Sequence, residues 1–144
     1  MTKPQRLMNP YGLSIDLATA KRIAAAAVAE SERQGWLMAV AIADPNGDLV
    51  YFEKMDATQI GSIKVAIAKA RSAALYKRAT KVFEATLGAG GENLRVLGLE
   101  DAVPVEGGIP LLQDGKIIGA IGVSGGLAQE DGVAAAAGAA QLER

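Results

Sequence analysis

The sequence predicts a single α+β domain in which helices pack on an antiparallel sheet of about five strands. Three observations predict this fold class. Apolar residues recur at three- and four-residue spacing in several segments, β-favouring runs occur in pairs, and the connections within the pairs are too short for parallel crossovers. At 144 residues the chain has the length of one domain. We expect residues 1–12 to form an N-terminal tail and residues 13–144 to form the domain.

The first helix is predicted between Ser14 and Gly35. Ser14 is a candidate N-cap, because its hydroxyl oxygen can accept a hydrogen bond from a free amide at the helix start. Gly35 is expected to end the helix, since glycine adopts the left-handed C-cap conformation at little cost. The residues that recur at helical spacing are Leu17, Ala20, Ala24, Ala27 and Val28.

Two runs of β-favouring residues, 37–43 and 49–54, follow this helix. The turn sequence Asp-Pro-Asn-Gly-Asp separates them, so they are predicted to pair as an antiparallel hairpin. Because side chains alternate along a strand, the first run should place three of them on one face of the sheet: Met38, Val40 and Ile42.

A central helix is predicted over residues 59–78, and residues 80–87 extend it after a bend. Four glycines within residues 88–98 indicate a loop with one helical turn. Val103 and Val105 are expected to start an edge strand. The predicted apolar stripe of the central helix consists of Ile60, Ile63, Ile67, Ala70 and Ala74.

The C-terminal part is predicted to contain a second hairpin and the last helix. Residues 109–112 and 117–124 should pair across Asp114-Gly115, a dipeptide that favours the type I′ turn. The last helix is predicted over residues 128–142. Helices and hairpins in this order, without parallel crossovers, are typical of an α+β domain.

Composition excludes several classes of function. Lys and Arg (15) nearly balance Asp and Glu (16), and no block of like charges is present, which argues against nucleic acid or an anionic membrane surface as the partner. No segment has the length and apolar character of a membrane span or signal peptide, so we expect a cytoplasmic protein. A core rich in alanine buries little surface per residue, which favours a homo-oligomer.

The chain contains no histidine and no cysteine. These two residue types most often supply acid–base catalysis, nucleophiles and transition-metal ligands. With oxygen ligands alone and no EF-hand spacing, we expect no metal site. Catalysis, if present, has to use lysine, carboxylates or main-chain amides.

The glycine pair Gly125-Gly126 lies between a predicted strand and the last helix. Free amides at such a helix start, reinforced by the helix dipole, can bind a carboxylate, phosphate or enolate oxygen. Alternatively, the glycines only form a sharp corner, and Glu130 and Asp131 in the first helical turn complement the dipole. The sequence supports both interpretations equally.

Lys69 is the strongest single catalytic candidate. It lies on a flank of the central helix formed by small residues, where desolvation would favour a neutral amine that acts as a base, a Schiff-base amine or an anion anchor. The alternative is a lysine whose stem packs and whose ammonium reaches water.

Three carboxylates are further catalytic candidates. Asp56, Glu106 and Asp131 each lie beside a turn or a glycine, and a pair of carboxylates can perform acid–base work without histidine. Asp56 and Asp131 have the alternative role of helix caps.

Several short motifs together resemble the GlcG/HbpS family. The resemblance extends from about Leu13 to Ala140 and implies a profilin-like α+β fold, oligomers from dimers to octamers, and heme binding in several members. Related domains follow PduO-type cobalamin adenosyltransferases or are encoded beside enzymes of glycolate and aromatic catabolism. The motifs are Lys54-Met55-Asp56, Ser62-Ile63, Lys69-Ala70, Gly107-Gly108-Ile109-Pro110, Asp114-Gly115, the run from Gly119 to Gly126, and Glu130-Asp131.

Heme is the cofactor that this resemblance implies. Members that hold heme are thought to use a histidine as iron ligand, and this chain has none. An axial bond would then have to come from Met55, Tyr51, Tyr76 or a lysine.

Two functions follow from these observations. The first is an oligomeric binding protein whose glycine-rich pocket holds heme or another small organic ligand. The second is a cofactor-independent enzyme of a catabolic pathway, in which Lys69, Glu106 or Asp56 moves a proton on a carbonyl or carboxylate substrate and the corner amides stabilise the oxyanion. The residues predicted to form the pocket are Met55, Asp56, Lys69, Glu106, Gly107, Gly108, Ile109, Ser124, Gly125 and Gly126.

Overall fold

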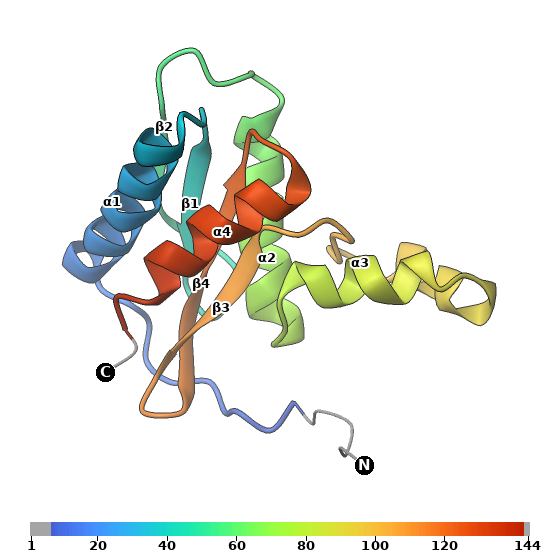
Figure 1. Cartoon of the computed structure of the whole chain (residues 1–144). Helices are drawn as coiled ribbons and strands as arrows, with labels where there is room; N and C mark the ends of the chain where they lie inside the picture. The colour runs from blue at the N-terminus through green and yellow to red at the C-terminus, as the bar shows by residue number, and fades with distance from the viewer. Residues whose placement is uncertain (1–6, 143–144) are drawn as a thin grey trace.

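The computed structural model describes residues 7–142 and has a four-stranded sheet with helices on both faces (Figure 1). All neighbouring strands are antiparallel, and their order is β2-β1-β4-β3. The strands are β1 (Ala39–Ala43), β2 (Leu49–Lys54), β3 (Gly108–Gln113) and β4 (Lys116–Ser124). The helices are α1 (Leu17–Gln34), α2 (Ser62–Tyr76), α3 (Thr80–Gly88) and α4 (Ala128–Ala139), with a 3₁₀ helix η1 (Gly91–Gly98).

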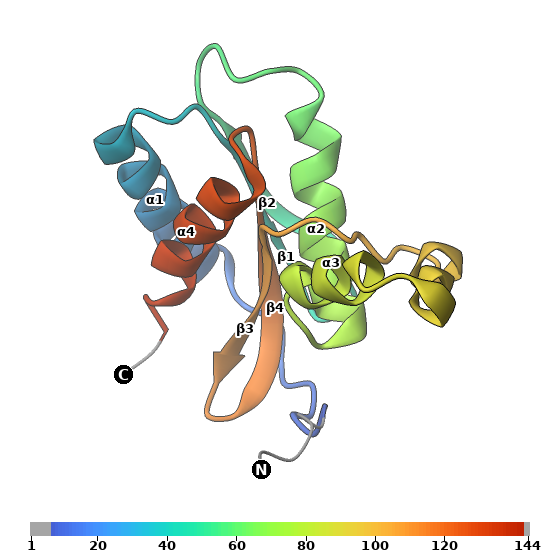
Figure 2. The ribbon, with the colours of Figure 1, turned by 45° about the vertical axis from the view of Figure 1, so that its right-hand side comes forward.

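The helices form a layer on each face of the sheet. Helices α1 and α4 lie side by side on one face, and α2 covers the other (Figure 2). Strand β1 supplies both cores by alternation, as predicted. Its neighbour Met38 and its residues Val40 and Ile42 join the core beneath α1 and α4, whereas its alanines pack against α2.

Helix α2 packs on the sheet mainly through small residues, which confirms Ala70 and Ala74 of the predicted apolar stripe and corrects Ile60. Ile60 precedes the helix and is 82% exposed. The cause is the close approach of α2 to Gly122 of β4: a Cβ built on Gly122 would lie 2.1 Å from the carbonyl oxygen of Ala66 and 2.4 Å from the nitrogen of Ala70. Side chains larger than that of alanine do not fit at this point of contact. The buried residues of α2 are Ser62, Ala66, Lys69, Ala70, Ser72, Ala73 and Ala74.

Both hairpins form as predicted. At the tip of the second, Asp114 and Gly115 have φ of 52° and 76°, the positive values that a type I′ turn requires. The cap of α1 was predicted wrongly. Asp16, and not Ser14, is the N-cap, and its Oδ1 accepts a hydrogen bond of 2.7 Å from the amide of Thr19.

The expected fifth strand at Val103 and Val105 is absent from the sheet of the described residues, which has four strands. This segment crosses over α2 instead, where the amide of Val103 donates to the hydroxyl of Ser72 at 3.0 Å. A short stretch near the N-terminus runs beside β4, and the amide of Gly12 donates to the carbonyl of Ile117 at 2.9 Å. Among residues 7–142, no helix has the length and apolar character needed to cross a membrane.

Candidate functional site

Lys69 forms a buried ion pair with Asp131. Its Nζ donates to Oδ2 of Asp131 at 2.8 Å and to the carbonyl oxygen of Val123 at 3.0 Å. The side chains are 1% and 4% exposed. Because Lys69 belongs to α2 and Asp131 to α4, the pair joins two helices that pack on opposite faces of the sheet.

The same aspartate closes the glycine corner. Its second oxygen, Oδ1, accepts a hydrogen bond of 2.9 Å from the amide of Gly126, and Glu130 accepts one of 2.9 Å from the amide of Leu127. The acidic residues of the first turn thus bind the helix start, in agreement with one of the two sequence interpretations. These two amides are occupied and not free for an external anion.

Burial dominates the electrostatics of Asp131. Removal from water raises the pKa of this carboxyl above its ordinary value of 3.8, although the hydrogen bonds from Lys69 and Gly126 act in the opposite direction. A raised pKa means that the ionised carboxylate is less favourable in the folded protein than in water. The ion pair therefore offsets only part of its own desolvation cost.

The structure brings several predicted pocket residues together around Lys69. A Cβ on Gly107 would lie 2.8 Å from the Lys69 Nζ, and one on Gly108 would lie 2.4 Å from the Lys69 carbonyl oxygen. Ser124, next to Val123, donates its hydroxyl to that of Ser62 at 3.2 Å. This cluster is tightly packed, and the close contacts leave little space for a ligand.

The other predicted residues have individual places. Asp56 is exposed in a turn after β2 and does not cap α2, whose N-cap is Gly61. The sulfur of Met55 accepts a hydrogen bond of 3.4 Å from the amide of Met38. Glu106 packs against α4, where a Cβ on Gly132 would lie 2.1 Å from its Oε2. The acidic candidates Asp56 and Glu106 therefore differ in environment, one in water and one against a helix.

Gly125 is also enclosed by the fold. A Cβ at this position would lie 2.2 Å from the carbonyl oxygen of Leu37, so the corner is pressed against the residue that leads into β1. With the Gly126 amide bonded to Asp131, both glycines of the pair have a clear structural task.

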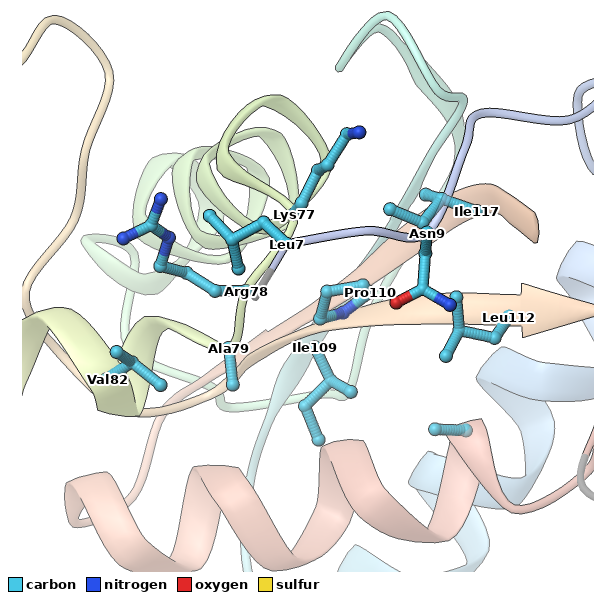
Figure 3. Close-up of a pocket in the computed structure, with 11 residues that line it drawn as sticks. Leu7, Asn9, Lys77, Arg78, Ala79, Val82, Ile109, Pro110, Leu112 and Ile117 are labelled. Atoms are coloured by element: carbon cyan, nitrogen blue, oxygen red, sulfur yellow. The ribbon is translucent and has the colours of Figure 1, made fainter. Parts of the chain in front are cut away.

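A cavity of about 560 Å³ lies elsewhere, beside the edge strand β3 (Figure 3). It is bounded by β3, by the junction between α2 and α3, and by the segment near the N-terminus. Ile109 is the one residue of the predicted pocket among its lining residues. These are Leu7, Asn9, Lys77, Arg78, Ala79, Val82, Ile109, Pro110, Leu112, Ile117 and Ala139.

Two consecutive basic residues, Lys77 and Arg78, lie at the rim of this cavity. The Lys77 Nζ is 5.0 Å from the ring centroid of Tyr11, and the Arg78 guanidinium carbon is 5.0 Å from that of Phe83. Within residues 7–142, neither side chain forms an ion pair with a carboxylate. In Figure 3 their stems reach the cavity wall while their charged ends point away from its centre.

The sequence analysis missed these two residues. The available signal was a pair of cations in the three-residue junction between two helices, Lys77-Arg78-Ala79, but such pairs on a surface are usually solvated. Their position beside a cavity depends on Leu7 and Pro110, which are distant in the chain.

The fold is thus a three-layered α+β domain. The buried ion pair of Lys69 and Asp131 lies at one end of the sheet, and an apolar cavity lies beside its edge strand. Residues 15–140 match the family model described as haem degrading protein HbpS-like, and the chain belongs to this family. The protein GlcG of Escherichia coli strain K12 is 37% identical over 112 residues, which cover 78% of this chain and 81% of GlcG. The family predicted from the motifs is confirmed.

Solved structures agree with this assignment. A double mutant of HbpS from Streptomyces reticuli has a TM-score of 0.83 at 25% identity and covers 99% of this chain and 96% of its own. A structure described as a PduOC:heme complex has a TM-score of 0.79 at 26% identity, with 89% of this chain and 94% of its own covered. The second of these relatives binds heme.

Proposed function

We propose that the protein binds a small organic ligand in the cavity beside β3. The observation that carries this proposal is the cavity itself, whose volume of about 560 Å³ falls within the ~300–1,000 Å³ of typical ligand sites. Its walls are mainly apolar, and cationic groups lie at one rim. Heme is the ligand to test first, because a relative of similar structure was crystallised with it.

The lining residues fit the porphyrin body better than they fit its iron. The apolar wall can contact a flat macrocycle, and Arg78 and Lys77 are placed for its propionates. The iron has poor partners, because the sequence contains no histidine or cysteine. Among the lining side chains, the candidate iron ligands are the amide oxygen of Asn9 and the amine of Lys77.

The axial ligands considered from the sequence are not part of the lining. Met55 accepts a hydrogen bond from Met38, the Tyr51 hydroxyl donates to Glu53, and the Tyr76 hydroxyl donates to the carbonyl of Glu100. We therefore expect the macrocycle, and not the iron, to supply the affinity.

Titration with hemin and with metal-free protoporphyrin IX tests this proposal. Both should bind saturably, followed by the Soret band and by porphyrin fluorescence, and their dissociation constants should agree within about tenfold, since no strong iron ligand is present. Ala79→Trp places an indole in the cavity and should abolish binding. Ala18→Trp, on the exposed surface of α1 and outside the lining, is the matched control and should bind normally.

The proposal fails if wild-type protein binds neither porphyrin nor the smaller aromatic probe pyrene-1-carboxylate. It also fails if Ala79→Trp binds them as well as Ala18→Trp does, because the ligand would then occupy another place.

The alternative function, a cofactor-independent enzyme, has weaker support. Its proposed base, Lys69, is 1% exposed and bonded to Asp131, and the amide of Gly126 is bonded to the same carboxylate. A base needs access to the substrate proton within hydrogen-bond reach. The tight packing around Lys69 favours a structural role over this catalytic one.

The predicted homo-oligomer remains part of the proposal. Helices α3 and η1 form an arm that extends from the body of the molecule in Figures 1 and 2. Leu94 and Leu97 on η1 are 54% and 68% exposed, so a second copy of the chain is a suitable cover for them. Light scattering after gel filtration should give more than one chain mass for wild type and a smaller assembly for Leu97→Glu. A monomeric wild type would contradict this part.

A further inference from the structure

We propose that the natural ligand of this cavity is an apolar carboxylate, and that Arg78 and Lys77 bind its carboxylate group. This inference rests on the proposed function and specifies its ligand class. It follows from the charges at the rim and from one unusual backbone conformation.

The two cations lack a carboxylate partner among the described residues. The two basic residues of α2 that are at least partly buried each have one: Lys69 pairs with Asp131, and Arg71 lies 3.6 Å from Asp48 and 3.4 Å from Asp101. Lys77 and Arg78, by contrast, rest against aromatic rings among the described residues. Half-buried cations beside an apolar wall leave a local positive potential that an anionic ligand can neutralise.

Within the described residues, the guanidinium group of Arg78 has unused hydrogen-bond donors. Its Nε donates to the carbonyl oxygen of Tyr76 at 2.9 Å, which holds the guanidinium near the end of α2 in the absence of a ligand. Neither terminal nitrogen has a protein hydrogen-bond acceptor in the described part of the chain. A planar pair of free N–H groups matches the two oxygens of a carboxylate.

The backbone conformation of Lys77 also supports a role for its side chain. This residue has φ of 55° and ψ of 29°, the left-handed conformation, at the C-cap of α2. Glycine is the favoured residue there, because any side chain adds steric strain. Gly35 occupies the equivalent position of α1. A lysine in this place is explained if its side chain has a use that glycine cannot supply.

The remaining wall defines the rest of the ligand. Pro110 of β3 lacks an amide hydrogen, and Ile109, Leu112, Ile117 and Val82 present hydrocarbon, so most of the cavity offers no hydrogen-bond donors. An apolar body with its acid group at the α2–α3 junction matches this distribution. The charged ends point outward in Figure 3 and would turn inward on binding, which exchanges a contact with an aromatic ring for an ion pair.

Fluorescence titration with pyrene-1-carboxylate and its uncharged analogue pyrene-1-carboxamide tests the inference. Wild type should bind the acid at least about tenfold more tightly than the amide, the factor expected for a hydrogen bond to a charged group. Arg78→Gln should remove most of this preference and leave the affinity for the amide unchanged. Arg71→Gln, which removes an ion-paired arginine of α2 outside the cavity lining, should retain the full preference.

Lys77→Gly gives a second and independent readout. It removes a cation and also relieves the left-handed strain, so the preference for the acid should fall while the thermal midpoint stays the same or rises. A fall in both would show that the lysine serves the fold.

The outcomes separate the two proposals. Equal binding of acid and amide to wild type overturns the carboxylate inference and leaves the cavity as a ligand site. Retention of the preference in Arg78→Gln overturns it as well. Absence of binding by both probes, hemin and protoporphyrin IX overturns the proposed function, and the inference with it.

Discussion

Basic side chains are fully or partly buried at two places in this molecule, and the two places differ in how the positive charge is balanced. Lys69 is almost completely buried, and a carboxylate and a carbonyl oxygen of the protein accept its hydrogen bonds. Lys77 and Arg78 are half-buried beside an empty volume, and aromatic rings are their charge-stabilising neighbours. The first place is complete without a ligand, whereas the second is balanced better by an added anion.

Burial of a charge therefore does not by itself identify a functional site. A buried charge with a partner holds elements together, and a charge that lacks one beside a cavity indicates a ligand. If this contrast holds, loss of the Lys69–Asp131 pair destabilises the fold, whereas loss of Arg78 affects ligand binding.

The largest effect is expected from breaking the buried pair. Asp131→Ala leaves the Lys69 ammonium without its carboxylate and the Gly126 amide without its acceptor, so the free energy of unfolding should fall by about 3–5 kcal/mol. Urea denaturation measures this change. The matched control is Asp16→Ala, which removes an exposed N-cap of α1 and should cost about 1 kcal/mol.

The double variant Lys69→Met/Asp131→Leu sharpens this test. Replacing both charges with apolar groups should restore most of the lost stability, because the raised pKa of Asp131 indicates an incomplete offset of desolvation. If Asp131→Ala costs no more than the Asp16→Ala control, the pair does not have the structural role assigned to it.

A somewhat smaller effect is expected where α2 touches the sheet. Gly122→Ala forces a methyl group against the Ala66 carbonyl and should lower the free energy of unfolding by about 3 kcal/mol. Gly88→Ala, in α3 with open space around its added methyl, is the control and should be neutral or stabilise by up to about 1 kcal/mol. Equal effects in thermal or urea unfolding would mean that the close approach of α2 does not hold Lys69 in place.

The smallest effect is the pH dependence contributed by Asp131. Because its pKa is raised in the folded protein, the folded state binds more protons than the unfolded state above the ordinary value of 3.8. The carboxyl group therefore contributes stability that is present at lower pH and is lost as the pH rises through the raised pKa. The free energy of unfolding of wild type, minus that of Asp131→Asn, should decrease as the pH rises above the ordinary carboxyl value of 3.8. An increase would mean that attraction to Lys69 outweighs burial.

Local patterns were sufficient for much of the fold. The two hairpins have turn sequences that determine their pairing, and the alternation in β1 correctly assigned Met38, Val40 and Ile42 to one face. The face of α2 was assigned only in part: Ala70 and Ala74 are buried, but Ile60 is exposed, because the periodicity of large residues cannot reveal how closely the helix approaches Gly122. Val103 has strand propensity, but its amide donates to the hydroxyl of Ser72 instead of to a neighbouring strand.

The site was less accessible to sequence reasoning. The small residues around Lys69 left open whether its ammonium is buried or reaches water, and the structure shows it buried. Its partner Asp131 lies 62 positions further along the chain. The cavity requires Leu7, Arg78 and Ile109 to meet, and no local pattern encodes that meeting. The motifs identified the family correctly, while the motif glycine Gly126 is hydrogen-bonded within the fold.

The most direct measurement compares pyrene-1-carboxylate affinity in two variants, Arg78→Gln and the charge-free pair Lys69→Met/Asp131→Leu. We expect Arg78→Gln to weaken binding by at least about tenfold and the Lys69→Met/Asp131→Leu variant, once shown to be folded, to bind like wild type. Weakened binding in Lys69→Met/Asp131→Leu with normal binding in Arg78→Gln would exclude the cavity as the binding site, since the ligand would then depend on the buried ion pair.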